Sequence, residues 1–194
     1  MVTTLATLIL TQTGVAMSAD AAKPLQNGAK APMVKLNDID GKSRDLKSIL
    51  SGKPTVVVFY RGGWCPFCNA QLAELGQNMA AIQAKGYNLI GISPDLPANL
   101  KATIGKNKLE YPLYSDAKAE ALRKFGIAFK VDGLTFTTYK EKYKLDLEKW
   151  SGENHHILPV PSVYVIDAKG TIKFSYSNPD YRVRLKANAL LAAL

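Results

Sequence analysis

Residues 54–68 read PTVVVFYRGGWCPFC, and this stretch decides the fold. Its first part, residues 54–60, is a continuous β-branched and aromatic run, which is typical of a strand buried on both faces of a sheet. Arg61-Gly62-Gly63 ends the run, and apolar residues then recur at helical spacing from Cys68 to Ile82. A buried strand that passes directly into an amphipathic helix predicts a sheet covered by helices.

The segments on either side complete this pattern. A hairpin around Asp40-Gly41 precedes the stretch, and residues 126–158 are the least regular part, interpreted as an insertion with strands near 136–139. Further helices are expected at 46–50, 98–107, 117–125 and 183–194, and further strands at 88–93, 111–114, 162–167 and 171–176. The order predicts an α/β, thioredoxin-like fold, in which helices flank a mixed central sheet. An N-terminal hairpin extension and an insertion before the last hairpin are the expected additions.

Composition places the chain among ordinary globular proteins. It has 194 residues, of which 47% are hydrophobic and 21% charged, and its net charge is +9. The basic residues are scattered, and the densest stretch, residues 140–149, alternates basic with acidic side chains. A solvated surface therefore explains the charge, and we expect no nucleic-acid partner and no stable membrane association.

The first 22 residues differ from the rest. Residues 5–17 are mostly apolar, no Lys or Arg precedes Lys23, and the apolar part is too short to span a bilayer. A secretory signal fits this length, although the positive start of such signals is absent; a frayed or packed helix is the alternative. Small residues that suit cleavage are Ala16 and Ser18, or Ala19 and Ala21. We predict a signal peptide or unstructured segment at 1–22, one domain at 23–194, and a periplasmic or secreted protein, with a cytoplasmic location as the alternative.

The two cysteines, Cys65 and Cys68, are the only ones in the chain. A bridge across three residues closes a very short loop, so it restrains the unfolded chain little and is a poor structural staple. A zinc or copper site would need further ligands, and only the adjacent His155 and His156 remain as nitrogen donors. We therefore predict redox chemistry with no metal and no cofactor.

The expected position of Cys65 favours a reactive thiol. It lies where the strand gives way to the helix, beside unpaired backbone N–H groups and the positive end of the helix dipole. In such settings a cysteine pKa falls from about 8.5 to roughly 3.5–7.5. Cys68, one turn on, can reach the same sulfur. Arg61 on the connecting loop is a candidate catalytic residue that adds positive charge; capping the strand or pairing with a surface acid is its alternative role.

Pro161 is the second expected element of the site. In a thioredoxin arrangement, the loop before the third core strand faces the cysteines, and a cis X-Pro bond there presents backbone to the substrate. Leu158-Pro159-Val160-Pro161-Ser162 has proline in the fitting place, although an ordinary turn proline is the alternative. Trp64 and Pro161 are therefore the predicted substrate-binding residues.

Three segments together resemble a known family. Residues 59–69 (FYRGGWCPFCN), 91–94 (GISP) and 161–167 (PSVYVID) are similar to peroxiredoxin-like proteins of the alkyl hydroperoxide reductase / thiol-specific antioxidant family. The similarity runs from about Gly28 to the C-terminus. It implies reduction of hydroperoxides by a peroxidatic cysteine, with thioredoxin or a similar thiol donor as reductant.

The family motif fits this chain with substitutions. Its pattern Pro-x-x-x-Thr-x-x-Cys places the cysteine on Cys68, the threonine on Cys65 and the proline on Arg61, and the polar residue three positions later is Gln71. The threonine and arginine that activate peroxide in the family are not in their usual places. Where the family has an arginine before the late core strand, this chain has Pro161-Ser162.

Two functions follow from these features. In a thiol peroxidase, one cysteine attacks the peroxide and becomes a sulfenic acid, and the other condenses with it to a Cys65–Cys68 disulfide. The family motif makes Cys68 the attacking residue, whereas helix position makes it Cys65. In the alternative, a thioredoxin-like protein disulfide oxidoreductase, Cys65 attacks a partner's disulfide. A homodimer is left open as the assembly.

Cleavage of the predicted signal peptide would shorten the protein at its N-terminus. We expect protein purified from its native host to begin between about Ser18 and Lys23, because small residues precede that point. Intact-mass measurement and N-terminal sequencing check this expectation. An uncleaved N-terminus on protein from the native cytosol would contradict it.

Overall fold

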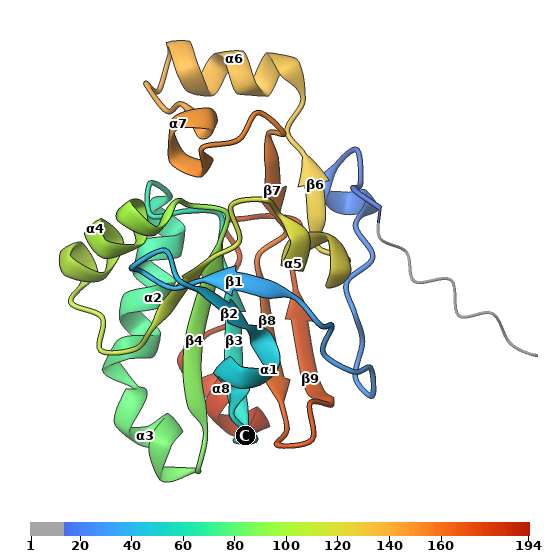
Figure 1. The fold of residues 1–194 in the computed structure, drawn as a ribbon, viewed down its shortest axis with the longest axis vertical. Coiled ribbons are helices and arrows are strands. Elements are labelled where there is room, and N and C mark those ends of the chain that lie inside the picture. The colour runs from blue at the N-terminus through green and yellow to red at the C-terminus, as the bar shows by residue number, and fades with distance from the viewer. Residues whose placement is uncertain (1–13) are drawn as a thin grey trace, which may run out of the picture.

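The buried run forms the central strand of a seven-stranded sheet in the computed structural model, which describes residues 14–194 (Figure 1). The strand order is β2-β1-β5-β4-β3-β8-β9. The strands are β1 (Lys35–Asn37), β2 (Ser43–Asp45), β3 (Thr55–Phe59), β4 (Asn88–Ser93), β5 (Leu113–Ser115), β8 (Ser162–Ile166) and β9 (Ile172–Ser177). All of β3 is buried, because β4 pairs with it on one side and β8 on the other. The predicted mixed sheet and N-terminal hairpin are confirmed.

The directions of the strands place one end of each of four strands at the same edge of the sheet. β3, β4 and β5 are parallel, whereas β8 runs antiparallel to β3 and β9 antiparallel to β8. Phe59 therefore lies opposite Ser162, which in turn lies opposite Ser177. The residues after β3, β4 and β9 and those before β8 all emerge at this edge, which we call the active edge.

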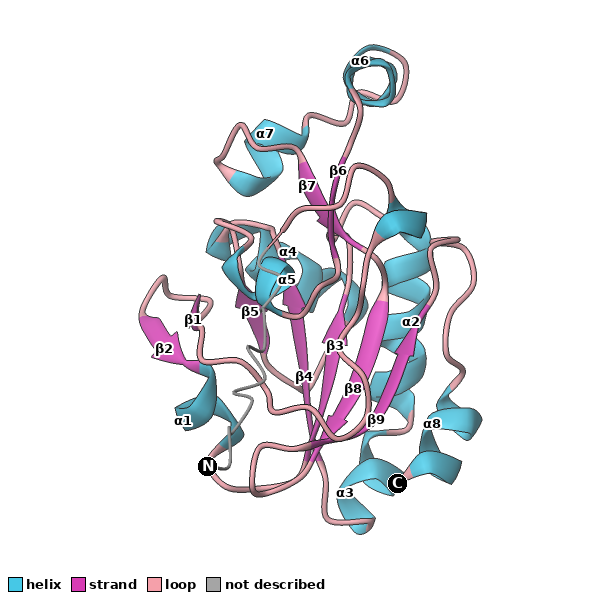
Figure 2. Cartoon of the chain, turned by 90° about the vertical axis from the view of Figure 1, so that its right-hand side faces the viewer, coloured by secondary structure: helices cyan, strands magenta, loops and turns pink. Residues whose placement is uncertain are grey.

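Helices cover both faces of the sheet. Figure 2 shows α2 and α8 on one side and α1 on the other. The helices packed on the sheet are α1 (Leu46–Leu50), α2 (Pro66–Gln77), α3 (Met79–Ala84), α4 (Pro97–Asn107), α5 (Glu120–Lys124) and α8 (Ala187–Ala193). Alternate β3 side chains serve the two cores: Val56 and Val58 pack with Leu72 of α2, and Val57 and Phe59 with Leu122 of α5. The helix predicted to continue from Cys68 to Ile82 is two helices, which meet at Asn78.

The insertion forms a separate arm, seen at the top of Figure 1. Strands β6 (Ala128–Lys130) and β7 (Ile157–Pro159) pair as a two-stranded ribbon and carry α6 (Gly133–Glu141) and α7 (Leu147–Ser151). We call residues 128–159 the arm. The strands expected near 136–139 are wrong, because those residues lie in α6. The Asp132 side chain caps this helix by accepting from the Thr135 backbone N–H at 2.9 Å, and the Phe136 ring stacks on His156.

Residues 14–25 run beside the arm and α5. The Ala16 backbone N–H donates to the Ala128 carbonyl at 3.0 Å, and the Lys130 N–H donates back to the Ala16 carbonyl at 2.9 Å. The first 13 residues, which include most of the predicted signal, lie outside the described part of the chain, so cleavage stays a prediction. Within residues 14–194, no helix is both long and apolar enough to cross a membrane.

The last helix is shorter than predicted. It was expected from Val183 but begins at Ala187, and residues 178–186 form an extended loop that leaves the active edge after β9. Glu74 of α2 explains the later start, since its carboxylate accepts from the Ala187 backbone N–H at 3.0 Å and lies 3.7 Å from the Lys186 ammonium. We call residues 178–186 the C-terminal loop.

Candidate active site

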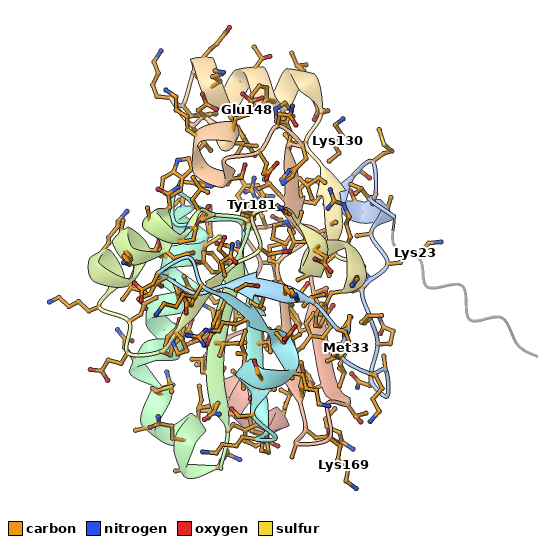
Figure 3. The ribbon with its side chains drawn as sticks, viewed as in Figure 1. Lys23, Met33, Lys130, Glu148, Lys169 and Tyr181 are labelled. Carbon is orange, nitrogen blue, oxygen red and sulfur yellow. The ribbon has the colours of Figure 1, made fainter. Side chains whose placement is uncertain are left out.

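The active edge gathers the residues expected to carry the chemistry. The loop with Arg61 and Trp64 follows β3, Asp95 follows β4, and Pro161 precedes β8. The C-terminal loop follows β9, and Figure 3 shows its Tyr181 where the arm meets the body of the domain. The sheet topology thus brings together side chains from distant parts of the sequence.

The two cysteines occupy the start of α2. Cys65 is the N-cap residue, Pro66 opens the helix, and Cys68 lies in the first turn. Both are free thiols and both are buried, with 1% of Cys65 and none of Cys68 exposed. In the described residues, no three His, Cys, Asp or Glu side chains are grouped as metal ligands.

The surroundings of the two sulfurs shift the pKa values of the two cysteines in opposite directions. The hydrogen bond from the Cys68 side chain, the Cys68 backbone N–H and the charges of Arg61 and Arg184 outweigh burial and lower the pKa of Cys65 to about 6. Burial raises the pKa of Cys68 well above its usual value, and the hydrogen bond and charge of Cys65 add to the effect. At neutral pH Cys65 is a thiolate and Cys68 a thiol. The electrostatics favour Cys65 as the nucleophile over the Cys68 that the family motif implies.

Arg184 contacts both sulfurs and was missed by the sequence analysis. Its Nη2 lies 3.3 Å from Cys68 Sγ and 4.0 Å from Cys65 Sγ. Its Nη1 donates to Gln71 Oε1 at 3.2 Å, and its Nε to the Tyr181 carbonyl at 2.7 Å. The residue had been placed inside the predicted last helix. Asn178-Pro179-Asp180, a group of turn formers directly after β9, indicated a loop before that helix, but no local signal placed the start of the helix after Arg184.

Arg61 lies close to the cysteines, but in an aromatic enclosure. Only 4% of it is exposed, and its Nη2 donates to the Tyr139 hydroxyl of α6 at 2.7 Å. Its guanidinium carbon is 4.2 Å from the Tyr181 ring centroid and 5.0 Å from that of Trp64. Within residues 14–194 it forms no ion pair with a carboxylate, so the surface-acid alternative is wrong.

The two residues predicted to bind substrate have other contacts. Trp64 packs its ring against Arg61 and lies 6.2 Å from the Tyr139 ring, so it helps to enclose the guanidinium. Pro161 lines a cavity of about 250 Å³ together with Arg61, Tyr139 and Tyr181.

The expected cis bond at Pro161 is wrong, since residues 14–194 contain no cis peptide. The flanking backbone groups are already hydrogen-bonded: the Val160 N–H donates to the Ile127 carbonyl at 2.8 Å, and Ser162 Oγ donates to the Val160 carbonyl at 2.8 Å. The Pro161 carbonyl accepts from the Asn178 N–H at 3.2 Å. The backbone at Pro161 therefore presents no free strand edge to a substrate.

A buried carboxyl supports the loop before the cysteines. Asp95 is 1% exposed, and its Oδ2 accepts from the Gly63 backbone N–H at 2.8 Å. Burial raises the pKa of Asp95 to about 7, against the effect of its hydrogen bonds. Gly63 packs so closely on α4 that an added Cβ would overlap the Thr103 hydroxyl. The glycines thus let the loop lie flat against α4 and the end of β4.

The contact of Arg184 with the sulfurs gives a direct prediction. Arg184→Gln removes a positive charge that lowers the pKa of Cys65, so we expect that pKa to rise by about half a unit to one unit. The rate of thiol alkylation as a function of pH measures the change. Arg182→Gln is the matched control, because Arg182 is exposed and pairs with Asp180 on the same loop. Superimposable titration curves for Arg184→Gln and the unmodified protein would exclude this role for Arg184.

The chain is similar in sequence to known peroxiredoxins. Peroxiredoxin Q of Gentiana triflora is 29% identical over 154 residues, which cover 79% of this chain and 60% of that protein. Peroxiredoxin Bcp of Escherichia coli is 33% identical over 104 residues, covering 54% of this chain and 66% of that protein. The chain thus spans only about 60% of the length of the peroxiredoxin Q relative.

Solved structures and a family model complete the comparison. Reduced Prx3 of Vibrio vulnificus in complex with hydrogen peroxide has a TM-score of 0.72 at 16% identity, covering 87% of this chain and 98% of that chain. Peroxidoxin BcpB of Mycobacterium tuberculosis has a TM-score of 0.66 at 21% identity, covering 87% and 96%. These likenesses show the thioredoxin-type fold of peroxiredoxins. The model of the AhpC/TSA family matches residues 27–175, and the chain therefore belongs to that family.

Proposed function

We propose that this protein is a thiol peroxidase that reduces hydroperoxides through Cys65 and Cys68. The observation that carries the proposal is the bridge from Arg184 to both sulfurs, at the position where the pKa of Cys65 is lowered to about 6. A guanidinium in this place stabilises a thiolate, and its Nη2 can donate to a peroxide or sulfenate oxygen. Membership of the AhpC/TSA family and the peroxiredoxin relatives point to the same chemistry.

In the first step, the Cys65 thiolate attacks the terminal oxygen of the hydroperoxide. The O–O bond breaks, Cys65 becomes a sulfenic acid, and the alkoxide or hydroxide takes up a proton and leaves as alcohol or water. Arg184 is placed to stabilise the charge that moves from sulfur to oxygen, and Arg61 adds a second positive charge near Cys65. These two arginines take the activating role of the threonine and arginine that the chain lacks in their usual places.

In the second step, Cys68 attacks the sulfur of the Cys65 sulfenic acid. Its thiol proton leaves with the hydroxyl group as water, and the Cys65–Cys68 disulfide forms. Two thiols of a reductant then return the pair to its reduced state. We propose a dithiol donor such as thioredoxin for this step.

The burial of the sulfurs favours a peroxidase over a protein disulfide oxidoreductase. Cys65 is 1% exposed beneath Arg184, and Pro161 presents no free backbone edge for an extended substrate. A peroxide of a few atoms needs a smaller opening to such a sulfur than a folded partner's disulfide, which cannot approach without displacing the C-terminal loop. The oxidoreductase reading is therefore the second candidate.

Treatment of reduced protein with one equivalent of hydrogen peroxide tests the proposal. We expect both thiols to be lost much faster than from free cysteine, and dithiothreitol to restore them. Cys68→Ser should stop at a sulfenic acid on Cys65, detectable by dimedone labelling and mass spectrometry, whereas Cys65→Ser should react no faster than free cysteine. Slow oxidation of the unmodified protein, with rapid reduction of a protein disulfide, would support the second candidate instead.

The pH dependence of the first step follows from the acidity of Cys65. Because the thiolate reacts, the rate should fall as pH falls through about 6, with about tenfold less thiolate at pH 5 than at pH 7. The hydrogen bond from Cys68 is the main cause of the low pKa, so Cys68→Ala should move the inflection upward more than Cys68→Ser, which keeps a donor. Stopped-flow kinetics measure both profiles. A rate independent of pH between 5 and 7 would contradict the assignment of Cys65.

A further inference from the structure

The arm reaches the active edge through a part-buried polar contact. Tyr139 of α6 accepts a hydrogen bond from Arg61 Nη2 at 2.7 Å, across 78 residues of sequence. The Tyr139 ring lies 6.2 Å from the Trp64 ring, and its centroid is 5.9 Å from the Arg61 guanidinium carbon. Tyr181, at the junction of arm and body in Figure 3, covers another side of the same guanidinium.

Arg61 depends on this contact because its surroundings supply few acceptors. It is almost fully buried, its Nε has no hydrogen-bond partner, and no carboxylate of the described residues pairs with it. Aromatic faces attract a guanidinium but do not accept its N–H groups in fixed directions. Without the Tyr139 hydroxyl a second buried donor would lack a partner, and the guanidinium would move towards water.

We propose that Tyr139 is a positioning residue: its hydroxyl, delivered by the arm, holds the Arg61 guanidinium beside Cys65 and makes the arm part of the active site. The inference rests on the proposed role of Cys65 as the nucleophile. It assigns a function to the arm, which otherwise only extends from the body of the domain.

The other charged groups near Cys65 have hydrogen bonds of their own that do not involve the Tyr139 hydroxyl. Arg184 is fixed by Gln71 and the Tyr181 carbonyl, and Asp95 by the Gly63 backbone. Cys68 belongs to α2 itself. Loss of the Tyr139 hydroxyl should therefore act on Cys65 through Arg61, whose charge is among the causes of the lowered pKa of Cys65.

The arm also brings two histidines to this region. His155 and His156 line a small cavity with Arg61 and Asp95. Burial lowers the pKa of His155, and His156 lies 2.8 Å from Glu148 within the arm. Both histidines are present in every variant, so the alkylation of all variants is compared over the same pH range.

Tyr139→Phe tests the proposal, since it removes the hydroxyl and keeps the ring. Alkylation of reduced protein as a function of pH gives the pKa of Cys65 without using peroxide. We expect this pKa to rise by about half a unit, which is about threefold less thiolate at pH 5. Tyr143→Phe is the control: Tyr143 is 62% exposed, lies 6.4 Å from Tyr139 by ring centroids, and has no contact with Arg61. It should leave the titration unchanged.

A double-mutant cycle shows whether Tyr139 acts through Arg61. Arg61→Gln alone should raise the pKa of Cys65, and adding Tyr139→Phe should raise it no further. An unchanged or lowered pKa in Tyr139→Phe would overturn the proposal, as would shifts that simply add. Circular dichroism confirms that each variant is folded. Failure of the unmodified protein to reduce peroxide would count against the proposed function alone, because the alkylation measurement does not depend on it.

Discussion

A buried thiolate needs positive partners, and the rest of this structure is arranged around that requirement. Cys65 and Cys68 are removed from water at the start of α2, where burial alone raises both pKa values. A hydrogen bond between the two side chains and the charges of two arginines reverse the effect for Cys65 only. The pKa values of the two thiols are thereby shifted in opposite directions, so a short motif yields two chemically distinct thiols.

The mixed sheet makes this environment possible. Parallel pairing of β3 with β4, antiparallel pairing of β3 with β8, and antiparallel pairing of β8 with β9 place the loop with Arg61, the carboxyl of Asp95 and the C-terminal loop at one edge. Arg184 arrives from the end of β9 and is separated from Cys68 by 116 residues of sequence. A guanidinium from a distant element is held half-buried beside the sulfurs, because Gln71 Oε1 accepts from its Nη1 and the Tyr181 carbonyl accepts from its Nε.

Local sequence patterns were enough to predict the elements that depend on adjacent residues. The β3 run, the glycine loop and the start of α2 each have a clear signal in a few adjacent residues, and these place Cys65, Cys68 and Arg61 together. Predictions from the sequence were wrong where long-range contacts determine the secondary structure. Phe136 to Tyr139 have strand-forming residues but are helical, because Asp132 caps α6 and Phe136 stacks on His156. Arg184 was hidden in an apparent helix whose start is set by Glu74, more than 100 residues earlier.

The departures from the family motif have a physical explanation in the geometry. The position of the motif's threonine is Cys65, and that of its cysteine is Cys68, which gives Cys65 a hydrogen bond instead of receiving one from a hydroxyl. In the proposed mechanism, the donor and the nucleophile have therefore exchanged places along the same helical turn. Arg184, which lies 3.3 Å from one sulfur and 4.0 Å from the other, suits either order of attack. In that mechanism Cys68 lies within one turn of Cys65, so the proposed disulfide joins the N-cap of α2 to its first turn.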